Sequence, residues 1–536
     1  MKLKNLLVLL LLLGSAFVLS ACSGSEGPRE SGAQGESSST GDKGPAGDKG
    51  PAGDKGPTGD TGEAGANGVQ IEFSFTSEGL AWRYVGETEW NIGITFNEIY
   101  TVVNEYEVGP IIKAHGFDIV VDSSYAHLAA GAEQTVFGEA LVYGETLFGD
   151  LESAFAAAKV ASEAEGYEGL QIFINKGEYA AARLEASNVE LFGPNVGVDP
   201  NDASVLRVGE ATFIEPVVIA GDNVVVDGIA VDQSGKIKLA PEGGVDNLTI
   251  QNVLFMSTSI YNSSEDGRIE LIWATDDDGK YIAGEDYTNL VVKNSRFEGN
   301  GTRLQNIHGM QLNGLQVLNC VFLGANKAVW DDCIKFYESY TYSIKGEVLV
   351  EGNVFANFTQ YAVWLLDFGP GNYVVRANKF ENCGLADESY NRGTLTINSP
   401  ATSLFFNTKE EKVVDADGNP VLDENGAEQF KTVLDKENPI EGAKAIVTYT
   451  KNEVVSSSVG ARIGYAGLVE GQIEANVNYN VFEQIVKADR IVTNENTNTF
   501  AAINAENNFF DIEVSDANFI GVNAWSKLNT REEALQ

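Results

Sequence analysis

A short pattern of apolar and polar positions recurs along much of the chain. Each copy has a strand of alternating apolar residues, many of them β-branched, then Asn or Gly, and shortly afterwards Phe. The clear copies end at Phe255, Phe297, Phe322, Phe355, Phe380 and Phe510, and degenerate copies occupy 189–193 and 224–228. One such unit cannot bury its own apolar face. The copies are therefore predicted to stack as coils of a solenoid.

The Asn at the bend of each unit adds a second prediction. Asn tolerates left-handed backbone, and its side-chain amide can bond to the equivalent residue one coil away. We therefore expect an internal asparagine ladder, with the Phe residues stacked beside it. The bend residues that define the expected ladder are Asn252, Asn294, Asn319, Asn378 and Asn507.

A helix is expected just before the repeats, over residues 150–165. Leu151, Ala154, Phe155 and Ala158 fall on one helical face, and Asp150 can cap the helix. An alternating strand that closes in a Gly turn follows at 170–179.

With the repeats, these features resemble the right-handed parallel β-helix of the pectin-lyase-like superfamily. The resemblance implies an all-β, single-stranded solenoid over about residues 145–515. It implies the fold rather than the activity, because this fold carries lyases, hydrolases, esterases and adhesins alike.

The first residues have the pattern of a lipoprotein signal peptide. Lys2 and Lys4 precede a short apolar run at 6–13, and the segment ends in Leu19-Ser-Ala-Cys22. That ending resembles the lipobox of bacterial lipoproteins, which implies that Cys22 carries diacylglycerol and anchors the mature chain to a membrane. The alternative is an ordinary signal peptide over 1–22. Residues 23–40 are rich in Ser, Gly and Glu and are expected to form a flexible spacer.

A strict glycine period follows the spacer. Every third residue from Gly41 to Gly68 is Gly, which is typical of a collagen triple helix because only Gly fits where three polyproline-II chains meet. A collagen strand requires two partners, so a homotrimer is expected. The alternative is a disordered Gly/Pro linker.

The remaining segments give simpler expectations. Residues 69–110 are expected to form an aromatic-rich β neck whose aromatics pack rather than bind sugar, and 111–144 an irregular β lead-in. Turn residues within 409–439 predict a hairpin that projects from the β-helix. The polar tail at 516–536 is expected to form a helix after residue 527 or to fray.

The charge of the chain limits its partners. The net charge is −41, which argues against nucleic acid as a partner. The same charge argues against polyanionic sugars, which would need bound cations or a local basic pocket to overcome this field. Three cysteines remain after Cys22, at irregular spacing, and are expected to be buried thiols: Cys320, Cys333 and Cys383.

Three groups of residues are candidates for chemistry. Asp331 and Asp332 resemble the Asp-Asp-Cys element of polygalacturonase-like glycosidases, in which the carboxylates act as acid and base. The other motifs of those enzymes are missing here, so a solvated turn is the alternative. Arg303 and His308 lie close along the chain and could supply a base, and Asp276, Asp277 and Asp278 could bind Ca²⁺. No cofactor is required, with Ca²⁺ as the one possible ion.

These observations predict a trimeric surface lipoprotein whose β-helix head binds glycans or neighbouring surfaces. Three heads on one stalk would raise the apparent affinity of weak individual sites. The alternative is a surface-displayed polysaccharide hydrolase or lyase that uses Asp331 and Asp332. A third hypothesis is a passive coat protein without a saturable ligand.

Overall fold

The protein is described here from a computed structural model. The described residues are 71–76, 79–95, 108–232, 234–240, 243–256, 267–271, 286–299, 305–324, 332–337, 341–385, 392–416, 418–423, 425–487, 490–494, 500 and 502–536. The expected signal peptide, spacer and collagen-like segment lie outside these residues and stay predictions. Among the described residues, no helix is both long and apolar enough to cross a membrane.

The segment expected to form a β neck contains a small antiparallel sheet. Its strands are β1 (Ile71–Phe75), β2 (Gly79–Tyr84) and β3 (Asn91–Thr95), joined in that order. The β structure expected for this segment is therefore present.

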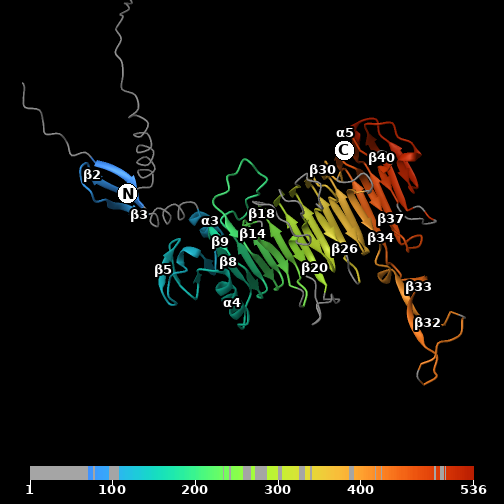
Figure 1. Ribbon diagram of the computed structural model, residues 1–536, viewed down its shortest axis with the longest axis horizontal. Coiled ribbons are helices and arrows are strands. Elements are labelled where there is room, and N and C mark those ends of the chain that lie inside the picture. The colour runs from blue at the N-terminus through green and yellow to red at the C-terminus, as the bar shows by residue number, and fades with distance from the viewer. Residues whose placement is uncertain are drawn as a thin grey trace, which may run out of the picture. The chain divides into compact units, whose positions relative to one another are not determined.

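The repeats form a parallel β-helix, in which successive coils stack their strands into three parallel sheets (Figure 1). We name the sheets by the order in which a coil visits them. The first sheet contains β4 (Ile119–Val121), β7 (Leu147–Phe148), β8 (Leu170–Ile174), β11 (Val189–Phe192), β14 (Val224–Asp227), β17 (Leu248–Gln251), β20 (Tyr287–Lys293), β23 (Leu312–Leu318), β26 (Ile344–Glu351), β29 (Phe368–Arg376), β34 (Ala445–Thr450), β37 (Ile473–Asn478), β40 (Ile503–Phe510) and β42 (Ala524–Lys527).

The second sheet follows the bend of each coil and is made of short strands. They are β9 (Gly177–Tyr179), β12 (Ala211–Phe213), β15 (Ala230–Val231), β18 (Leu254–Phe255), β21 (Arg296–Glu298), β24 (Val321–Leu323), β27 (Val354–Ala356), β30 (Lys379–Glu381), β35 (Glu453–Val455) and β38 (Val481–Glu483).

The third sheet completes each coil. Its strands are β10 (Ala182–Leu184), β13 (Pro216–Ile219), β16 (Lys236–Leu239), β19 (Gly267–Leu271), β22 (Gln305–Gly309), β25 (Ile334–Phe336), β28 (Val363–Leu366), β31 (Gly393–Asn398), β36 (Val459–Ile463), β39 (Val492–Thr493) and β41 (Phe519–Ile520).

The predicted Phe stack is confirmed inside the coils. Consecutive rings are nearly parallel, with centroids 4.2 Å apart between Phe255 and Phe297 and 4.5 Å between Phe297 and Phe322. The stack continues to Phe355 at 5.0 Å and from there to Phe380 at 4.9 Å. These side chains are buried, so the stack fills the space beneath the second sheet.

The asparagine ladder exists, but its position requires a correction. Asn252, Asn294 and Asn319 do adopt left-handed backbone, with φ of 55°, 47° and 53°. Asn378 is a ladder residue as predicted, but in the other copies the ladder position lies one residue later than the expected bend residue, where side chains point inward. The ladder runs through Asn353, Asn378, Asn452, Asn480 and Asn508, with Nδ2–Oδ1 distances of 2.9–3.0 Å.

Bend and ladder are therefore two adjacent positions, and a left-handed bend residue turns its side chain away from the core. Gly352 takes the bend position before Asn353, where a Cβ would lie 2.5 Å from Asn319 Oδ1. In earlier coils the ladder position holds Val253, Ser295 and Cys320, so the Asn ladder covers the later coils only.

Additional elements close the ends of the solenoid. Helix α4 (Leu151–Ser162) is capped by the Asp150 side chain, as predicted, and buries Leu151, Ala154, Phe155 and Ala158. The first sheet extends beyond residues 145–515 at both ends, because β4 and β42 pair with it. β4 lies in the segment expected to be an irregular lead-in, where a strand of three residues gives little periodic signal.

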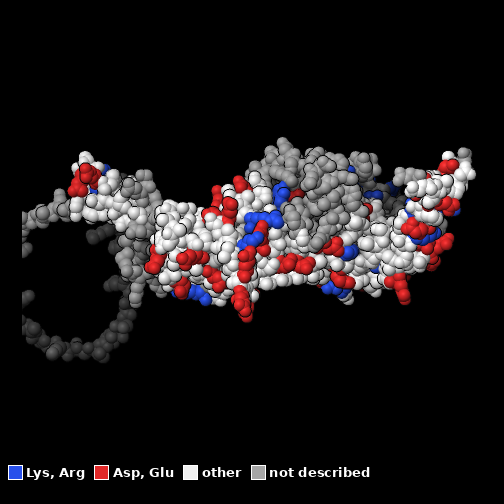
Figure 2. All heavy atoms as spheres, turned by 90° about the horizontal axis from the view of Figure 1, so that it is seen from below, with Lys and Arg blue, Asp and Glu red and all other residues white. Residues whose placement is uncertain are grey.

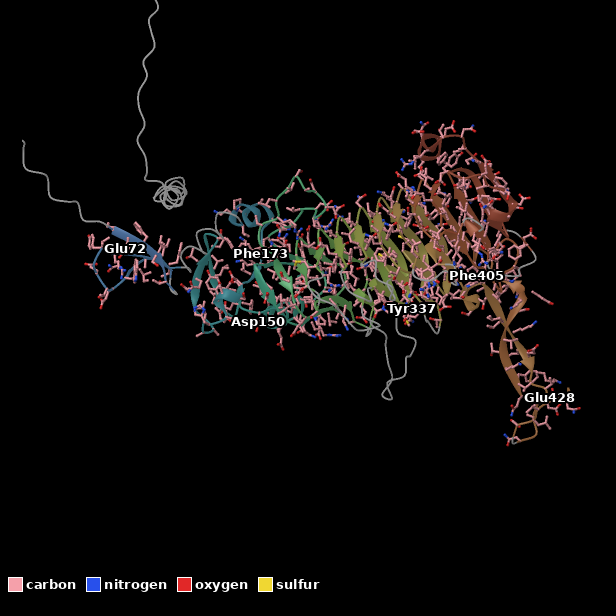
Figure 3. All side chains as sticks on the ribbon, turned by 45° about the horizontal axis from the view of Figure 1, so that its top comes forward. Glu72, Asp150, Phe173, Tyr337, Phe405 and Glu428 are labelled. Atoms are coloured by element: carbon pink, nitrogen blue, oxygen red, sulfur yellow. The ribbon has the colours of Figure 1, made fainter. Side chains whose placement is uncertain are left out.

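Smaller elements flank the coils. They are α3 (Gly109–His115), the hairpin β5 (Glu133–Val136) and β6 (Glu139–Val142), and the 3-10 turns Ser123–Tyr125, Thr402–Leu404 and Asp516–Asn518. The tail forms α5 (Arg531–Leu535), which Thr530 caps. The projecting insertion is confirmed as the antiparallel hairpin β32 (Phe406–Lys412) and β33 (Phe430–Pro439), and Glu428 lies toward its tip (Figures 1 and 3).

Candidate functional site

One column of outward-facing side chains on the third sheet contains several of the charged and aromatic residues that form the candidate site. Parallel pairing aligns one residue from each strand, and the column reads Lys238, Glu270, His308, Lys335, Trp364, Thr396, Arg462 and Thr493. Neighbouring strands in a sheet are about 4.8 Å apart, so each residue lies directly beside the next.

The period of two that builds the core also turns this column outward, although His308, Lys335, Thr396 and Thr493 are themselves buried. Around Lys335, for example, Ile334 and Phe336 point inward and are fully buried. The same alternation places Leu395 and Ile397 inside on either side of Thr396. The outward side chains are therefore not needed to fill the core, which leaves them available for another role.

Lys335 is held against two aromatic rings. Its ammonium nitrogen lies 4.0 Å from the ring centroid of Tyr337 and 5.2 Å from that of Trp364. Trp364 in turn stacks on Tyr361 at 4.5 Å, and Tyr337 lies against His308 at 5.3 Å. The rings and the cation form one continuous cluster alongside the middle coils, where Figure 3 labels Tyr337.

Asp332 lies beneath this cluster. Its carboxylate Oδ2 is 3.3 Å from Lys335 Nζ, and its Oδ1 accepts a hydrogen bond from the Tyr361 backbone N–H at 3.3 Å. The residue is only 1% exposed. Burial raises the pKa of the Asp332 carboxyl, and Lys335 opposes part of that rise. In this position Asp332 fixes the ammonium group of Lys335 over the rings.

Two arginines complete the cluster from later coils. Arg462 hydrogen-bonds the phenol of Tyr361, and Arg392 acts electrostatically on both Tyr361 and Asp332. Burial raises the pKa of Tyr361, and the two arginines oppose that rise. Burial lowers the pKa of the Arg462 guanidinium. These groups are thus partly desolvated, which strengthens their interaction with an incoming anion.

A second basic group lies on earlier strands of the same face. Lys236 and Lys238 approach Glu270 with Nζ–Oε2 distances of 3.8 and 3.3 Å. Arg268 donates to the backbone carbonyls of Asp232 and Met256. Acidic side chains are spread over the face of the molecule seen in Figure 2. On the third sheet, by contrast, Glu270 lies beside the two lysines Lys236 and Lys238.

The structure brings together two of the residues singled out from the sequence. His308, on β22, and Asp332, just before β25, belong to the same cluster, and both are 1% exposed. Asp331, Arg303, the triad Asp276–Asp278 and the lipidation residue Cys22 lie outside the described residues. Within the described part of the chain, no group of three or more His, Cys, Asp or Glu side chains is arranged to hold a metal ion.

The three other cysteines match the prediction of buried thiols. Cys320, Cys333 and Cys383 are buried and not joined in disulfides. Burial raises the pKa of Cys320 to about 12, so its thiol is protonated at neutral pH.

Sequence reasoning missed Lys335, Tyr337, Tyr361, Trp364, Arg392 and Arg462 as site residues. A signal for three of them exists, because several third-sheet strands contain a short apolar-x-apolar phrase whose middle residue faces outward. Ile334-Lys-Phe, Val363-Trp-Leu and Ala461-Arg-Ile contribute Lys335, Trp364 and Arg462 in this way.

Comparisons with known proteins add little to this picture. No protein-family profile matches the chain, and no curated protein matches it. Among solved structures, PfbA, a surface adhesin of Streptococcus pneumoniae, aligns with 67% of this chain and 80% of its own at 13% identity and a TM-score of 0.37.

Two other solved structures are similar at the same level. The Azotobacter vinelandii mannuronan C-5 epimerase AlgE4 A-module aligns with 72% of this chain and 95% of its own, at 11% identity and a TM-score of 0.30. A mutant of the PL6 family alginate lyase AlyGC aligns with 86% of this chain and 47% of its own, at 12% identity and a TM-score of 0.30. At such scores these likenesses carry no functional argument. The parallel β-helix is established by the strand pairing of this chain itself.

Proposed function

We propose that the protein is a trimeric, lipid-anchored surface protein whose β-helix head binds an acidic glycan along the outer face of the third sheet. Cys22 would provide the anchor and residues 41–68 the three-chain stalk. The observation that carries the binding function is the cluster of Lys335 with the rings of Tyr337 and Trp364.

The chemistry of the cluster suits a charged sugar. The rings offer apolar surface for the C–H face of a pyranose, and the flanking cations can pair with carboxylates. With a net charge of −41, the chain would repel a polyanion unless cations gather locally. Lys335, Arg392 and Arg462 form such a group. The trimer would then strengthen weak individual sites through effective concentration.

A binding measurement tests this proposal. The chain from Ser23 onward would be titrated with oligosaccharides rich in uronic acid and, in parallel, with neutral ones of equal length. We expect saturable binding of the acidic series that Lys335→Met weakens at least tenfold. Lys379→Met is the matched control, since Lys379 is exposed on the second sheet and pairs with Glu381. Equal affinity for neutral and acidic sugars, or equal loss in both variants, would count against the proposal.

A second candidate function is cleavage of the same kind of glycan. The observation that favours it is the hydrogen-bonded pair of Tyr361 and Arg462 beside Asp332, because such a cluster of titratable groups can transfer protons. Cleavage predicts unsaturated or reducing products that Tyr361→Phe, Asp332→Asn or Asp331→Asn abolishes. Saturable binding without any product over long incubation would exclude cleavage and support binding as the function.

A further inference from the structure

The small sheet of β1, β2 and β3 has one mixed and one largely apolar face. On the mixed face, Arg83 pairs with Glu72 at 2.6 Å and lies 4.3 Å over the ring of Trp90, and Ala81 and Ile92 lie on the same side. The other face is formed by the alternate residues of each strand. They are Ile71, Phe73, Phe75, Leu80, Trp82, Tyr84 and Ile94, which cross-strand pairing aligns.

This apolar face is exposed to an unusual degree. Phe75 is 68% exposed, Ile71 48% and Phe73 43%, although all three belong to one short strand. Trp82 and Tyr84 contact each other edge to face on the same side. Large contiguous apolar patches on a soluble surface mark contact sites, and a small sheet of this kind needs its apolar face covered to be stable.

The chain that precedes the sheet indicates what covers it. The glycine period of the proposed stalk ends at Gly68, so only Val69 and Gln70 separate it from Ile71. Such a short connection spans about 10 Å. If three chains meet in a triple helix, three copies of this apolar face are therefore held within a few side-chain lengths of one another, at a high effective concentration.

We propose that the apolar face of β1–β3 packs against the same face in two further copies of this chain and holds the proposed stalk together. This inference rests on the three-chain stalk of the proposed function. It also supplies what a short stalk lacks, because nine Gly-X-Y triplets form a marginal triple helix by themselves. The aromatics of this segment then act in assembly and not in sugar binding.

Two substitutions on the apolar face test this in the chain from Ser23 onward. Phe73→Glu places a charge at the centre of the face, and Phe75→Ser removes its most exposed ring, which makes the fewest contacts within a single chain. The matched control is Ser74→Glu, which adds the same charge to the same strand on the opposite face. Mass would be measured by sedimentation, and the melting midpoint by the triple-helical circular dichroism signal.

We expect a trimer for the unaltered chain and for Ser74→Glu. Phe73→Glu and Phe75→Ser should lower the melting midpoint of the triple-helical signal, the former by on the order of 10 °C or more. A chain lacking 41–68 should still associate in a concentration-dependent way, and Phe73→Glu should abolish that association.

Two negative results would have different meanings. Unchanged mass and melting in both face variants would overturn the inference and leave the stalk intact, and it would indicate that the face is covered within one chain. A single protomer for the unaltered chain would overturn the three-chain stalk and this inference with it. Neither result bears on glycan binding by the β-helix head.

Discussion

The outer faces of the first and third sheets rest on the same coils but carry different side chains. On the first sheet, the equivalent column consists of β-branched, aliphatic and amide residues: Thr249, Val291, Gln316, Leu349, Val374, Thr448 and Asn476. On the third sheet, the middle of the column is occupied by His308, Lys335, Trp364, Thr396 and Arg462. The inward residues of both sheets are alike and apolar.

This difference shows which positions specify the fold and which remain for function. Both columns satisfy the same alternation, so the solenoid does not require charged or aromatic residues on the third sheet. Partly desolvated cations stabilise a fold weakly at best. Charged residues also occur on the other sheets, as in the exposed pairs Arg376–Glu351 and Lys379–Glu381. The third-sheet column differs because buried cations lie against aromatic rings there, and a ligand best explains that combination.

The largest effect is expected from the inner stack that both faces share. Phe322 is fully buried between Phe297 and Phe355, with centroids at 4.5 and 5.0 Å. Phe322→Ala should lower the free energy of unfolding by about 3–5 kcal/mol, because it leaves a cavity among rings that cannot close it. Denaturant unfolding measures this, and a loss below about 1 kcal/mol would show that the stack is not a main source of stability.

The next effect concerns ligand binding on the third sheet. Trp364→Ala removes the ring shared by Tyr361 and Lys335, and should weaken binding of an acidic oligosaccharide by about 10- to 100-fold. The control is Tyr479→Ala, an exposed aromatic at a coil bend outside this column. Calorimetric titration gives both constants, and a similar loss in the two variants would remove the distinction between the two faces.

A smaller effect follows from the protonation of Asp332. Its pKa is raised in the folded state, so the native protein holds this proton more tightly than the unfolded chain does. The stabilisation from that proton is fully present below the unfolded pKa near 4 and is lost as pH rises through the folded pKa, at about 1.4 kcal/mol per pKa unit.

Asp332→Asn should therefore show a flatter stability–pH profile than the unaltered chain in that window. Unfolding midpoints measured between pH 4 and neutrality provide the comparison. Parallel profiles for the two proteins would mean that Asp332 titrates normally and is not held in the buried position described above.

The smallest effect is expected on the outer face of the first sheet. Arg376 pairs with Glu351 at 2.9 Å, and both side chains are substantially exposed. Arg376→Ala should change stability by less than about 1 kcal/mol, because surface ion pairs contribute little, and should leave glycan binding unchanged. Unfolding and titration on the same sample test both statements. Weaker glycan binding in this variant would indicate that the ligand contacts the first sheet and not the third.

Local patterns allowed much of the fold to be predicted from the sequence. The Phe stack, the left-handed Asn bends and the Asp150 cap each depend on residues within one coil or one helical turn. The ladder was predicted correctly at Asn378 and one position too early in the other copies, because Asn can occupy either the bend or the next residue. Only the direction of each side chain separates Asn507 from Asn508.

The site was harder to predict because it depends on register between coils. His308 and Asp332 stand out by residue type alone. Lys335, Trp364 and Arg462 align only when strands separated by segments of very different length are paired, as with Ile397 and Ile463 on either side of the β32–β33 hairpin. A lysine or tryptophan in an apolar-x-apolar phrase has no distinctive spacing until the strands are placed beside one another.

Hydrogen–deuterium exchange of the chain from Ser23 onward, with and without a saturating acidic oligosaccharide, would locate the bound glycan on the coils. If the glycan binds the third sheet, exchange should slow in β22, β25, β28 and β36 and stay unchanged in β23, β26 and β29 on the first sheet. Protection confined to the first sheet, or no protection anywhere on the coils, would contradict binding at the third sheet.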